Sequence, residues 1–476
     1  MLTELLAQAP DDAVFAGERT TTRAALVSSA TALADALTDI GVAGEVVAVM
    51  LPNDARAVVA LFGVWRAHAV HSPLNPRAAD PELDVILATL GPAAVVTTAE
   101  QAGRFAARGL PVVVASGDGW DVTTQREAGA ADRPTYDADV ALIQFTSGTT
   151  GPPKPVPMRH STVLDLMGRF APAADGRTPR PNLVPVSLSL WAGIYQVLFG
   201  FRRGAAVVLF DRFETQAFAR AVKRFEVRTT VLPPAAITML ADDENIADLA
   251  PLRTVRSITA PLSPVQARRF RDRFGVVVSN SYGQTELGGQ VVGWSPEDER
   301  AHADDKLGSV GRALPGIELR IDDGELLVRS PATTGGLIDV SFHDRLTTDG
   351  WFHTGDLGSI DSDGFLWLDG RVSDLINRGG NKVFPAHVED VLVGAPNVAE
   401  AAVVGVADDR LGEVPWAFVV TRDGVLDEVA LLGWCRERLT PYKVPVRIVA
   451  VEALPRNEVG KVLKRDLPAL AAEQRP

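Results

Sequence analysis

The chain has 476 residues, of which 46% are hydrophobic and 22% are charged, a balance typical of a globular enzyme with two or three domains. Its 60 acidic residues outnumber its 47 basic residues, and the net charge of −13 opposes non-specific binding to nucleic acid or anionic lipid. The single cysteine, Cys435, excludes an internal disulfide and a cysteine metal cluster. The sequence shows no apolar run of membrane-spanning length and no signal-peptide pattern, so we expect a cytoplasmic protein without a membrane span.

The first 140 residues alternate two kinds of pattern. Residues 24–40 and 55–67 have the apolar spacing of amphipathic helices. Residues 45–51, 93–98 and 111–115 are short runs rich in β-branched side chains, which favour strands. This alternation predicts an α/β arrangement in layers.

A short apolar strand then leads into a loop rich in glycine and hydroxyl groups at residues 142–154. Gly148 and Gly151 let the backbone approach an anion, and Lys154 adds a positive charge. Because Pro155 follows that lysine, the spacing excludes a Walker A loop. We interpret the segment as a phosphate-binding loop of another kind. Its hydroxyl donors are Thr146, Ser147, Thr149 and Thr150.

The pattern continues beyond this loop and then changes. Apolar residues at 163–170 share one helical face behind Ser161 and Thr162, which we expect to cap the helix. Residues 308–368 contain short strands and turns, which predict a small β-rich subdomain that ends near residue 370. Further strands are predicted at 205–210, 229–232, 276–279, 401–406, 417–421 and 446–451.

Two later motifs combine a glycine with a carboxylate. Residues 281–286 follow an apolar strand, so their side chains emerge at a strand end, where α/β folds place ligands. One carboxylate there, Glu286, has the hard oxygen donors that Mg²⁺ takes beside phosphate oxygens. In residues 351–357, Asp356 can accept two parallel hydrogen bonds, which suits a vicinal diol.

Five segments resemble, in order, the signatures of the adenylate-forming superfamily, which includes acyl-CoA synthetases, aryl-CoA ligases, peptide-synthetase adenylation domains and luciferases. They are residues 142–154, 281–286, 351–357, 370–385 and 454–464. The resemblance implies an α/β fold with a large N-terminal AMP-binding domain, made of two layered α/β subdomains and the small β-rich one. It also implies a smaller, mobile α+β C-terminal domain. We place the boundary between residues 1–370 and 371–476.

The resemblance also implies roles for single residues. Tyr282 would pack on the adenine, with Ala260 and Gly283 beside it, and Thr285 would approach the α-phosphate. Glu286 would hold Mg²⁺.

The resemblance also assigns residues to contacts with the ribose, the thiol substrate and the transition state. Asp356 would bind both ribose hydroxyls, and Arg371 would reach the ribose or a phosphate. Gly379 and Gly380 would pass close to the pantetheine arm when the C-terminal domain turns for the second half-reaction. Lys461 would touch both the substrate carboxylate and the α-phosphate, where an ammonium stabilises the transition state.

Three departures from the family pattern concern the nucleotide and the acid. Pro155 stands where relatives have glycine, and Ile258 and Thr259 replace two glycines of the adenine-lining stretch. Trp191 lies where most acyl-CoA synthetases have an aromatic–histidine pair, and we expect it to take over part of that role. Residues 185–210 contain no acidic side chain to pair with an α-ammonium group, which favours an aliphatic or aromatic acid over an amino acid.

The sequence therefore predicts an ATP-dependent acid–thiol ligase that uses ATP, Mg²⁺ and coenzyme A and acts on a small-molecule carboxylic acid. One alternative acceptor is the phosphopantetheine arm of an acyl carrier protein, which would make the partner a protein. A non-catalytic nucleotide-binding relative is the alternative from another class, and the departures at Pro155, Ile258 and Thr259 motivate it. Retention of Glu286, Asp356 and Lys461 weighs against it.

Overall fold

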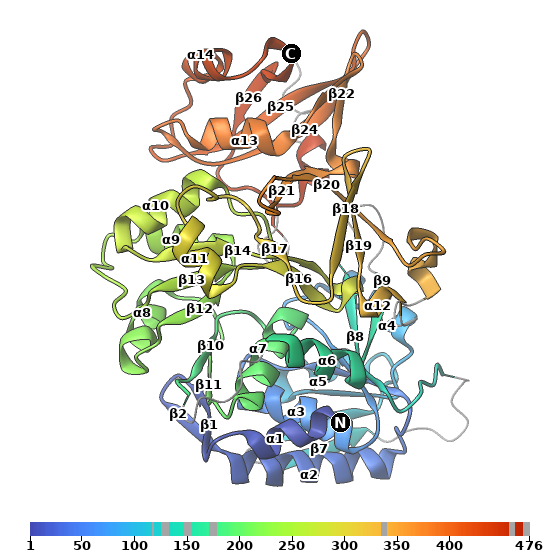
Figure 1. Cartoon of the computed structure of the whole chain (residues 1–476). Helices are drawn as coiled ribbons and strands as arrows, with labels where there is room; N and C mark the ends of the chain where they lie inside the picture. The colour runs from blue at the N-terminus through green and yellow to red at the C-terminus, as the bar shows by residue number, and fades with distance from the viewer. Residues whose placement is uncertain are drawn as a thin grey trace.

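The computed structural model describes residues 1–116, 119–124, 133–146, 154–170, 179–334, 340–456 and 462–469. Figure 1 shows a large body that contains both layered α/β parts, with the C-terminal residues forming a smaller unit at one end. Within the described part of the chain, no helix combines the length and the apolarity needed to cross a bilayer.

The first layered part is a seven-stranded sheet with the order β7-β6-β5-β3-β4-β8-β9. Its inner strands are parallel, and the two outermost pairs are antiparallel. The strands are β3 (Val46–Met50), β4 (Val70–Pro73), β5 (Ala94–Thr98), β6 (Val112–Ser116), β7 (Gly119–Thr124), β8 (Val140–Thr146) and β9 (Lys154–Arg159). The accompanying helices are α2 (Arg23–Ile40), α3 (Ala55–Arg66), α4 (Asp80–Leu90), α5 (Ala99–Ala106) and α6 (His160–Phe170).

The second layered part contains two smaller sheets. One has the order β10-β11-β1-β2, so an N-terminal hairpin joins strands that follow far along the chain, and the other is the parallel set β12-β13-β14. The strands are β1 (Asp12–Ala16), β2 (Arg19–Thr22), β10 (Asn182–Val184), β11 (Val207–Leu209), β12 (Thr229–Leu232), β13 (Thr254–Ser257) and β14 (Val277–Asn280). The helices are α1 (Leu5–Gln8), α7 (Trp191–Arg202), α8 (Thr215–Arg224), α9 (Pro234–Asp242) and α10 (Pro264–Phe274).

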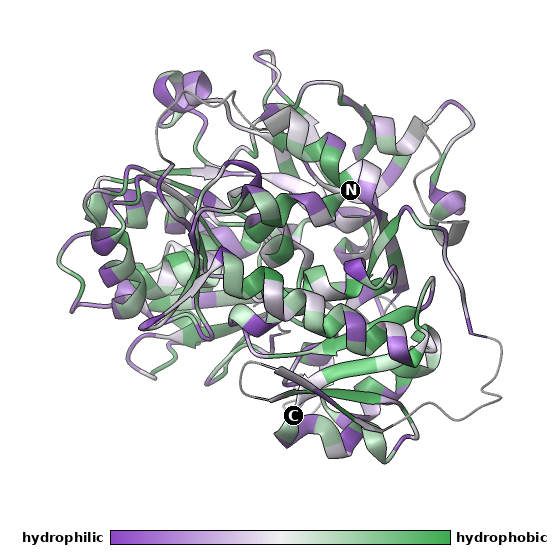
Figure 2. Cartoon of the chain, turned by 90° about the horizontal axis from the view of Figure 1, so that it is seen from below, coloured by the Kyte–Doolittle hydropathy of each residue, from purple (hydrophilic) through white to green (hydrophobic). Residues whose placement is uncertain are grey.

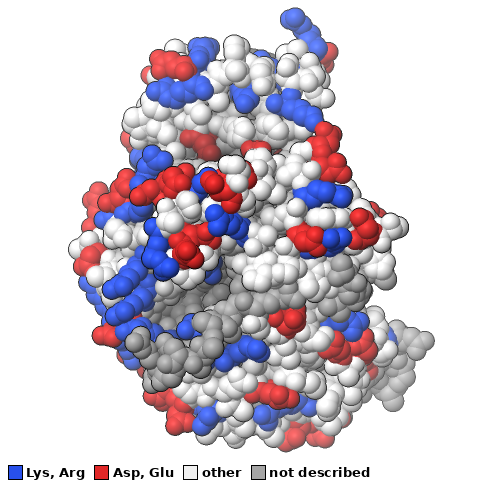
Figure 3. Space-filling view, viewed as in Figure 1, with Lys and Arg blue, Asp and Glu red and all other residues white. Residues whose placement is uncertain are grey.

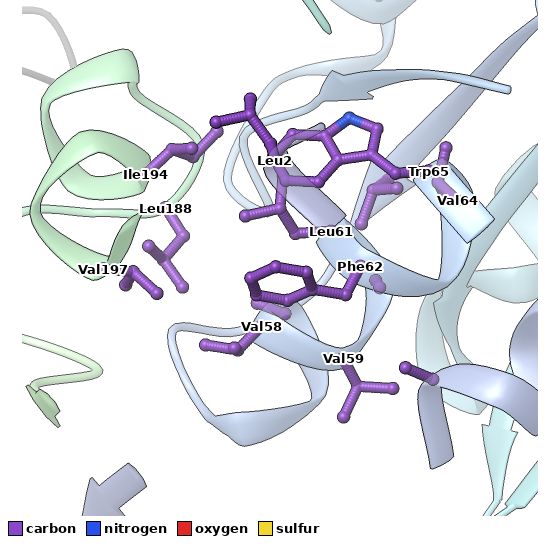
Figure 4. Close-up of a cluster of buried hydrophobic side chains, with 14 of the residues drawn as sticks. Leu2, Val58, Val59, Leu61, Phe62, Val64, Trp65, Leu188, Ile194 and Val197 are labelled. Atoms are coloured by element: carbon purple, nitrogen blue, oxygen red, sulfur yellow. The ribbon is translucent and has the colours of Figure 1, made fainter. Parts of the chain in front are cut away.

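A continuous apolar core joins these two parts. Phe62 and Trp65 of α3 are almost completely buried, and Ile194 and Val197 of α7 belong to the same cluster. Figure 4 shows side chains of α3 and α7 approaching one another, with Leu2 beside them. Full burial of each such side chain contributes roughly 1.5–3 kcal/mol, so this core holds the two parts in a fixed relation.

The predicted β-rich subdomain is confirmed, with a four-stranded antiparallel sheet in the order β18-β19-β20-β21 and a three-stranded sheet β15-β16-β17. The strands are β15 (Tyr282–Gln284), β16 (Gly289–Gly293), β17 (Arg312–Ala313), β18 (Glu318–Asp322), β19 (Glu325–Arg329), β20 (Phe352–Ile360) and β21 (Leu366–Arg371). Two short helices accompany them, α11 (Pro296–His302) and α12 (Pro331–Thr334).

The C-terminal unit has its own sheet and its own core. Cys435 is fully buried in that core, and burial raises the pKa of its thiol to about 11. The body shows the same combination in Figure 2, where the molecule is seen from below and hydrophobic strands lie between helices of mixed polarity. The elements are β22 (Ile376–Arg378), β23 (Asn381–Val383), β24 (Val398–Asp408), β25 (Gly412–Thr421), β26 (Arg447–Ala450), α13 (Pro385–Val393) and α14 (Glu428–Arg438). The boundary at residues 370 and 371 remains our proposal.

The predicted caps of α6 were wrong. The helix begins at His160, so Ser161 and Thr162 lie inside its first turn. Asp139 supplies the cap from the preceding segment, because its carboxylate accepts from the Ser161 backbone N–H at 3.0 Å and from the Ser161 hydroxyl at 2.6 Å. A carboxylate at this end also favours the helix dipole.

Candidate active site

The site is centred on Asp356 of β20, whose side chain is buried. Its Oδ2 accepts hydrogen bonds from the Tyr282 hydroxyl and from the Gln284 amide, each at 2.7 Å. Its Oδ1 lies 3.0 Å from Nε of Arg371. Tyr282 and Arg371 therefore both contact the Asp356 carboxylate, so three predicted ligand residues lie together.

Strand pairing brings these residues together. Asp356 and Arg371 are register partners in the antiparallel pair β20–β21, so their side chains share one face of the sheet. Tyr282 and Gln284 come from β15, which follows directly after the parallel strand β14. Burial and, second to it, the charge of Asp356 raise the pKa of the Tyr282 hydroxyl. The hydroxyl therefore stays protonated and donates a hydrogen bond to the carboxylate.

Two residues of the cluster were missed in the sequence analysis. Besides bonding to Asp356, the Gln284 amide donates to the Thr354 carbonyl at 2.9 Å. Arg345 donates to the same carbonyl at 2.7 Å, and its guanidinium lies 3.7 Å from the Glu286 carboxylate. Gln284 was inside a recognised motif and could have been found there. Arg345 lies in a segment without any motif, so only the folded chain reveals it.

Thr285 and Glu286 form a single helical turn after β15, and Gly288 ends the turn with a φ of 81°. The Glu286 side chain is largely buried, 14% exposed, near Arg345. Within the described ranges, no three His, Cys, Asp or Glu side chains gather into a metal cluster. One carboxylate beside substrate phosphates is nevertheless a sufficient donor set for Mg²⁺, so Glu286 fits the ion that the family uses.

The phosphate loop is only partly described. Ser147, Gly148, Thr149, Thr150 and Gly151 lie outside the described residues. Thr146 and Lys154 are described as paired residues of β8 and β9, and the Lys154 ammonium lies 5.7 Å from the centre of the Phe342 ring. Pro155 pairs with Phe145 within β9, which is the edge strand of its sheet. A proline is tolerated there because an edge strand can direct its missing N–H outward.

The stretch that should line the adenine follows the carboxyl end of β13. Ala260 is partly exposed there, and Thr259 is exposed with a φ of +73°. A β-branched residue is rarely found in this left-handed region, because its Cβ approaches the backbone. Replacement of the usual glycine has therefore kept the backbone conformation that glycine allows, at the cost of strain.

Trp191 begins α7 and reaches the turn after Glu286. Its indole N–H donates to the Gly288 carbonyl at 3.1 Å, and a Cβ at Gly289 would lie 3.1 Å from the same nitrogen. The ring also packs against Tyr195, with 5.6 Å between centroids. Trp191 therefore lies beside the turn that carries Glu286, and its role toward the acid stays a prediction.

The glycine pair in the C-terminal unit does not join this cluster. Gly379 and Gly380 form the β22–β23 turn with φ values of 58° and 87°, and the Gly379 N–H donates to the Leu411 carbonyl at 2.7 Å. This turn therefore lies beside the tip of the β24–β25 hairpin. In Figure 1, β22 lies on the side of the C-terminal unit away from the body, whereas α13 faces the body.

Lys461 lies outside the described residues. The Lys464 ammonium lies 2.6 Å from the carboxylate of Glu389 on α13, and both side chains are largely buried. This ion pair anchors the chain just after the last motif to its own domain.

Comparison with known families decides between the classes of protein considered above. The family model of AMP-binding enzymes matches residues 2–338, and that of the AMP-binding enzyme C-terminal domain matches residues 387–461. The chain belongs to the AMP-binding enzyme family. The resemblance seen in the motifs is thereby confirmed over most of the length.

Individual members of this family are similar over nearly their whole lengths. The long-chain-fatty-acid–CoA ligase FadD13 of Mycobacterium tuberculosis is 31% identical, covering 90% of this chain and 89% of its own. The feruloyl-CoA synthase of an Amycolatopsis species is 33% identical, with coverage of 96% and 95%. Among solved structures, the o-succinylbenzoate CoA synthetase of Bacillus subtilis in complex with its acyl-adenylate superposes with a TM-score of 0.84 at 27% identity, covering 98% and 97%.

Proposed function

We propose that this AMP-binding enzyme is an ATP-dependent ligase that joins a carboxylic acid to coenzyme A through an acyl-adenylate. The observation that carries the proposal is the convergence of Tyr282, Gln284 and Arg371 on the buried carboxylate of Asp356. The relatives named above as CoA ligases and synthases support the choice of acceptor. ATP and coenzyme A are available together in the cytoplasm, where we place the reaction.

The chemistry has two steps. A carboxylate oxygen of the acid attacks the α-phosphorus of ATP, and the bond from that phosphorus to the bridging oxygen breaks, which releases pyrophosphate. The sulfur of coenzyme A, whose proton passes to solvent, then attacks the acyl carbon, and AMP leaves with the electrons of the C–O bond. Adenylation converts a poor leaving oxygen into a good one, which makes the second step feasible.

Asp356 has the capacity to hold the ribose. A carboxylate has about four acceptor sites, and Tyr282, Gln284 and Arg371 use three of them. A diol needs two sites, so one of these donors must yield. Gln284 can do so at the smallest cost, because its amide keeps the hydrogen bond to the Thr354 carbonyl.

The remaining roles complete the proposal. Glu286 would hold Mg²⁺, which draws negative charge from phosphate oxygens when it is bound. Thr285 would approach the α-phosphate, and Lys154 would add charge beside the phosphate loop. Lys461, by its place in the last motif, would bring an ammonium to the attacked phosphate, where negative charge gathers in the transition state.

The acid faces an apolar, aromatic wall. Along α7, the Trp191 ring makes an edge contact with Tyr195 at 5.6 Å between centroids, and Tyr195 stacks on Phe199 at 6.0 Å. Such a surface binds aliphatic or aromatic carbon and offers no anion to an α-ammonium group. We therefore propose an aliphatic or aromatic carboxylic acid as substrate.

The test measures both steps separately. We expect acid-dependent exchange of pyrophosphate into ATP with members of a panel of fatty and aryl carboxylic acids, followed by thioester formation when coenzyme A is added. Lys461→Ala should keep ATP binding yet lose about 10² to 10³ in the exchange rate. Lys223→Ala is the control, because this ammonium lies exposed on α8, pairs with the surface carboxylate of Asp248 and should leave exchange near the wild-type rate.

Three outcomes would contradict the proposal. Exchange that is unchanged in Lys461→Ala removes the assigned role of that lysine. Thioester formed on a carrier protein but not on free coenzyme A assigns the alternative acceptor. ATP binding without exchange for any acid indicates the non-catalytic relative.

A further inference from the structure

Residues 185–190 form the loop that connects β10 to α7 and leads directly into Trp191. Leu188 in this loop is buried, and Figure 4 shows its side chain between α7 and α3. A Cβ at Gly193 would lie 2.2 Å from the Ser187 carbonyl oxygen, so the loop is in direct contact with the first turn of α7. The position of this loop therefore determines where Trp191 lies.

A buried asparagine of the first layered part holds the loop. Asn53 lies between β3 and α3 and is 7% exposed. Its Oδ1 accepts the Leu188 N–H at 2.7 Å, and its amide nitrogen donates to the Phe210 carbonyl at 2.8 Å and to the Val186 carbonyl at 3.4 Å. One side chain thereby joins the first part to the loop and to the residue that follows β11.

A buried glutamine holds the same loop from the strand that leads into the phosphate loop. Gln144 of β8 is 6% exposed, and its amide nitrogen donates to the Ser189 carbonyl at 3.1 Å. Its Oε1 is buried and has no hydrogen-bond partner among the residues that the structure describes. An unpaired buried oxygen costs free energy, and an apolar side chain of similar length would avoid that cost. An amide at this position therefore indicates a role beyond packing.

The loop lies between these two amides and the candidate active site. At the far end of the loop, the Trp191 indole bonds to the Gly288 carbonyl, in the turn that carries Glu286. A shift of the loop would move Trp191 relative to this turn, because the loop packs tightly on the start of α7. Asn53 and Gln144 therefore act on the site through the loop.

Discrimination between acids requires a contact of this kind. Figure 3 shows acidic and basic side chains intermixed over the face seen there. Such charges act on the carboxylate that all the acids share, so they steer all of them alike. Selection has to come from side chains that meet the rest of the acid, and Trp191 is the side chain that we assign to this task.

We propose that Asn53 and Gln144 are positioning residues of the acid site. They fix residues 186–190, hold Trp191 in place and thereby set which carboxylic acids are accepted. This inference rests on the proposed ligase function and on the role predicted for Trp191. Because both amides bond to the loop, their removal should alter the selection between acids and leave the KM for ATP nearly constant.

Gln144→Met tests the proposal with a side chain of similar shape. It removes the donor to Ser189 together with the unpaired oxygen, so the free energy of unfolding should stay close to that of wild type. The ratio of kcat/KM values between bulky and small acids in pyrophosphate exchange should shift about two- to tenfold, the range that the loss of one hydrogen bond allows.

Thr97→Val is the matched control. Thr97 is fully buried in the same large sheet, and its hydroxyl donates to the Met50 carbonyl at 2.9 Å. This variant loses a buried hydrogen bond to a backbone carbonyl away from the loop, so it should lower stability yet keep the wild-type ratio between acids. An equal shift of that ratio in Thr97→Val and Gln144→Met would overturn the proposal, because loss of a buried hydrogen bond anywhere would then have the same effect.

The double variant Gln144→Met/Trp191→Phe tests whether the glutamine acts through the tryptophan. If it does, the double variant should shift the ratio between acids no further than the larger single variant. Asn53→Ala should shift the ratio in the same direction as Gln144→Met, with a larger loss of stability because three hydrogen bonds disappear. Additive shifts in the double variant would contradict the proposed route through Trp191.

Hydrogen–deuterium exchange of the free protein gives a readout that does not depend on the reaction. The peptide that contains residues 186–191 should take up deuterium faster in Gln144→Met and Asn53→Ala than in wild type or Thr97→Val. Unchanged uptake, or an unchanged ratio between acids that the wild type activates, rejects the positioning role alone. Failure of the wild type to activate any acid rejects the proposed function, whereas faster uptake in the variants would still support the hold of the two amides on the loop.

Discussion

Asp356 and Arg371 face each other as register partners on β20 and β21, and their side chains form a 3.0 Å ion pair. Arg371 is also the first residue of the C-terminal domain in our division of the chain. Asp356, which we assign to the ribose, is therefore tied directly to the first residue of the C-terminal unit in that division. We propose that nucleotide binding at Asp356 influences the position of that unit through this pair.

Asp356→Asn should weaken ATP binding by at least about tenfold, which corresponds to about 1.4 kcal/mol. The asparagine amide would place donors toward the Arg371 guanidinium and would accept fewer hydrogen bonds from the ribose. Isothermal titration with ATP and Mg²⁺ measures the effect. Asp322→Asn on β18 is the control, since that carboxylate is exposed on the same sheet. Equal affinities for wild type and Asp356→Asn would refute the ribose assignment.

Trp191→Phe should change the specificity for the carboxylic acid more than it changes the KM for ATP. Phenylalanine keeps the packing on Tyr195 but loses the 3.1 Å hydrogen bond to the Gly288 carbonyl, worth about 0.5–1.5 kcal/mol. We expect the ratio of kcat/KM values between bulky and small acids to shift several-fold, with the KM for ATP nearly constant. Trp120→Phe is a matched control, because its indole bonds to Ser29. A parallel change for all acids would show a structural effect alone.

Thr259→Gly should raise the free energy of unfolding by about 0.5–1 kcal/mol, since glycine adopts a φ of +73° without the Cβ clash. Thr259→Ala keeps the Cβ and should bring no such gain. Urea unfolding measures both variants. If Thr259→Gly is instead less stable than Thr259→Ala, the strain assigned to this position is not present.

Two buried histidines should make the free energy of unfolding fall in mild acid. Burial lowers the pKa of His71 to about 3, from 6.5 in an exposed state, and it lowers the pKa of His160 to about 4. Each histidine is neutral in the folded state, so the unfolded chain binds more protons below pH 6.5. Each neutral histidine therefore makes its full contribution to the free energy of unfolding above this pH. As the pH falls below it, the free energy of unfolding decreases by up to about 1.4 kcal/mol per pH unit for each histidine.

The test compares wild type with His71→Leu by urea unfolding between about pH 7 and pH 5.5, a window above the range in which ordinary carboxylates titrate. The leucine variant should lose less stability over this interval than wild type does. His71 lies on β4 in the apolar layer and lines a small cavity beside Leu188 and Ile194 of the second part. Identical pH profiles would show that this imidazole is not held neutral.

Local patterns predicted much of this fold because most elements carry their own signal. The strands β3, β5 and β6 and the helices α2 and α3 lie within two residues of the predicted segments. The cap of α6 was not predicted, because Asp139 binds Ser161 across 22 residues of chain. The pairing of β1 with β11 was likewise not predicted, since nothing in either strand specifies a partner so distant in sequence.

The candidate site divides in the same way. Tyr282 and Asp356 were recognised because they belong to motifs with a fixed spacing. Arg345 was not, because it reaches Gln284 from 61 residues away and its role depends on how η3 (Val340–Arg345) packs against β20. Residues that contact a ligand can be predicted when they belong to a motif of fixed spacing. The side chains that orient those residues can come from any part of the chain, so the sequence does not identify them.

Two prolines in β9 affect whether copies of this protein can associate through the edge of the large sheet. Pro155 and Pro157 are two residues apart on the outermost strand of the large sheet, so both ring nitrogens face the same margin. Because β9 still pairs with β8, that margin is the open one. An extended peptide that approaches this margin meets carbonyl acceptors but lacks the N–H donors that strand pairing requires. The open edge of β9 therefore resists strand addition and the fibrils that would grow from it.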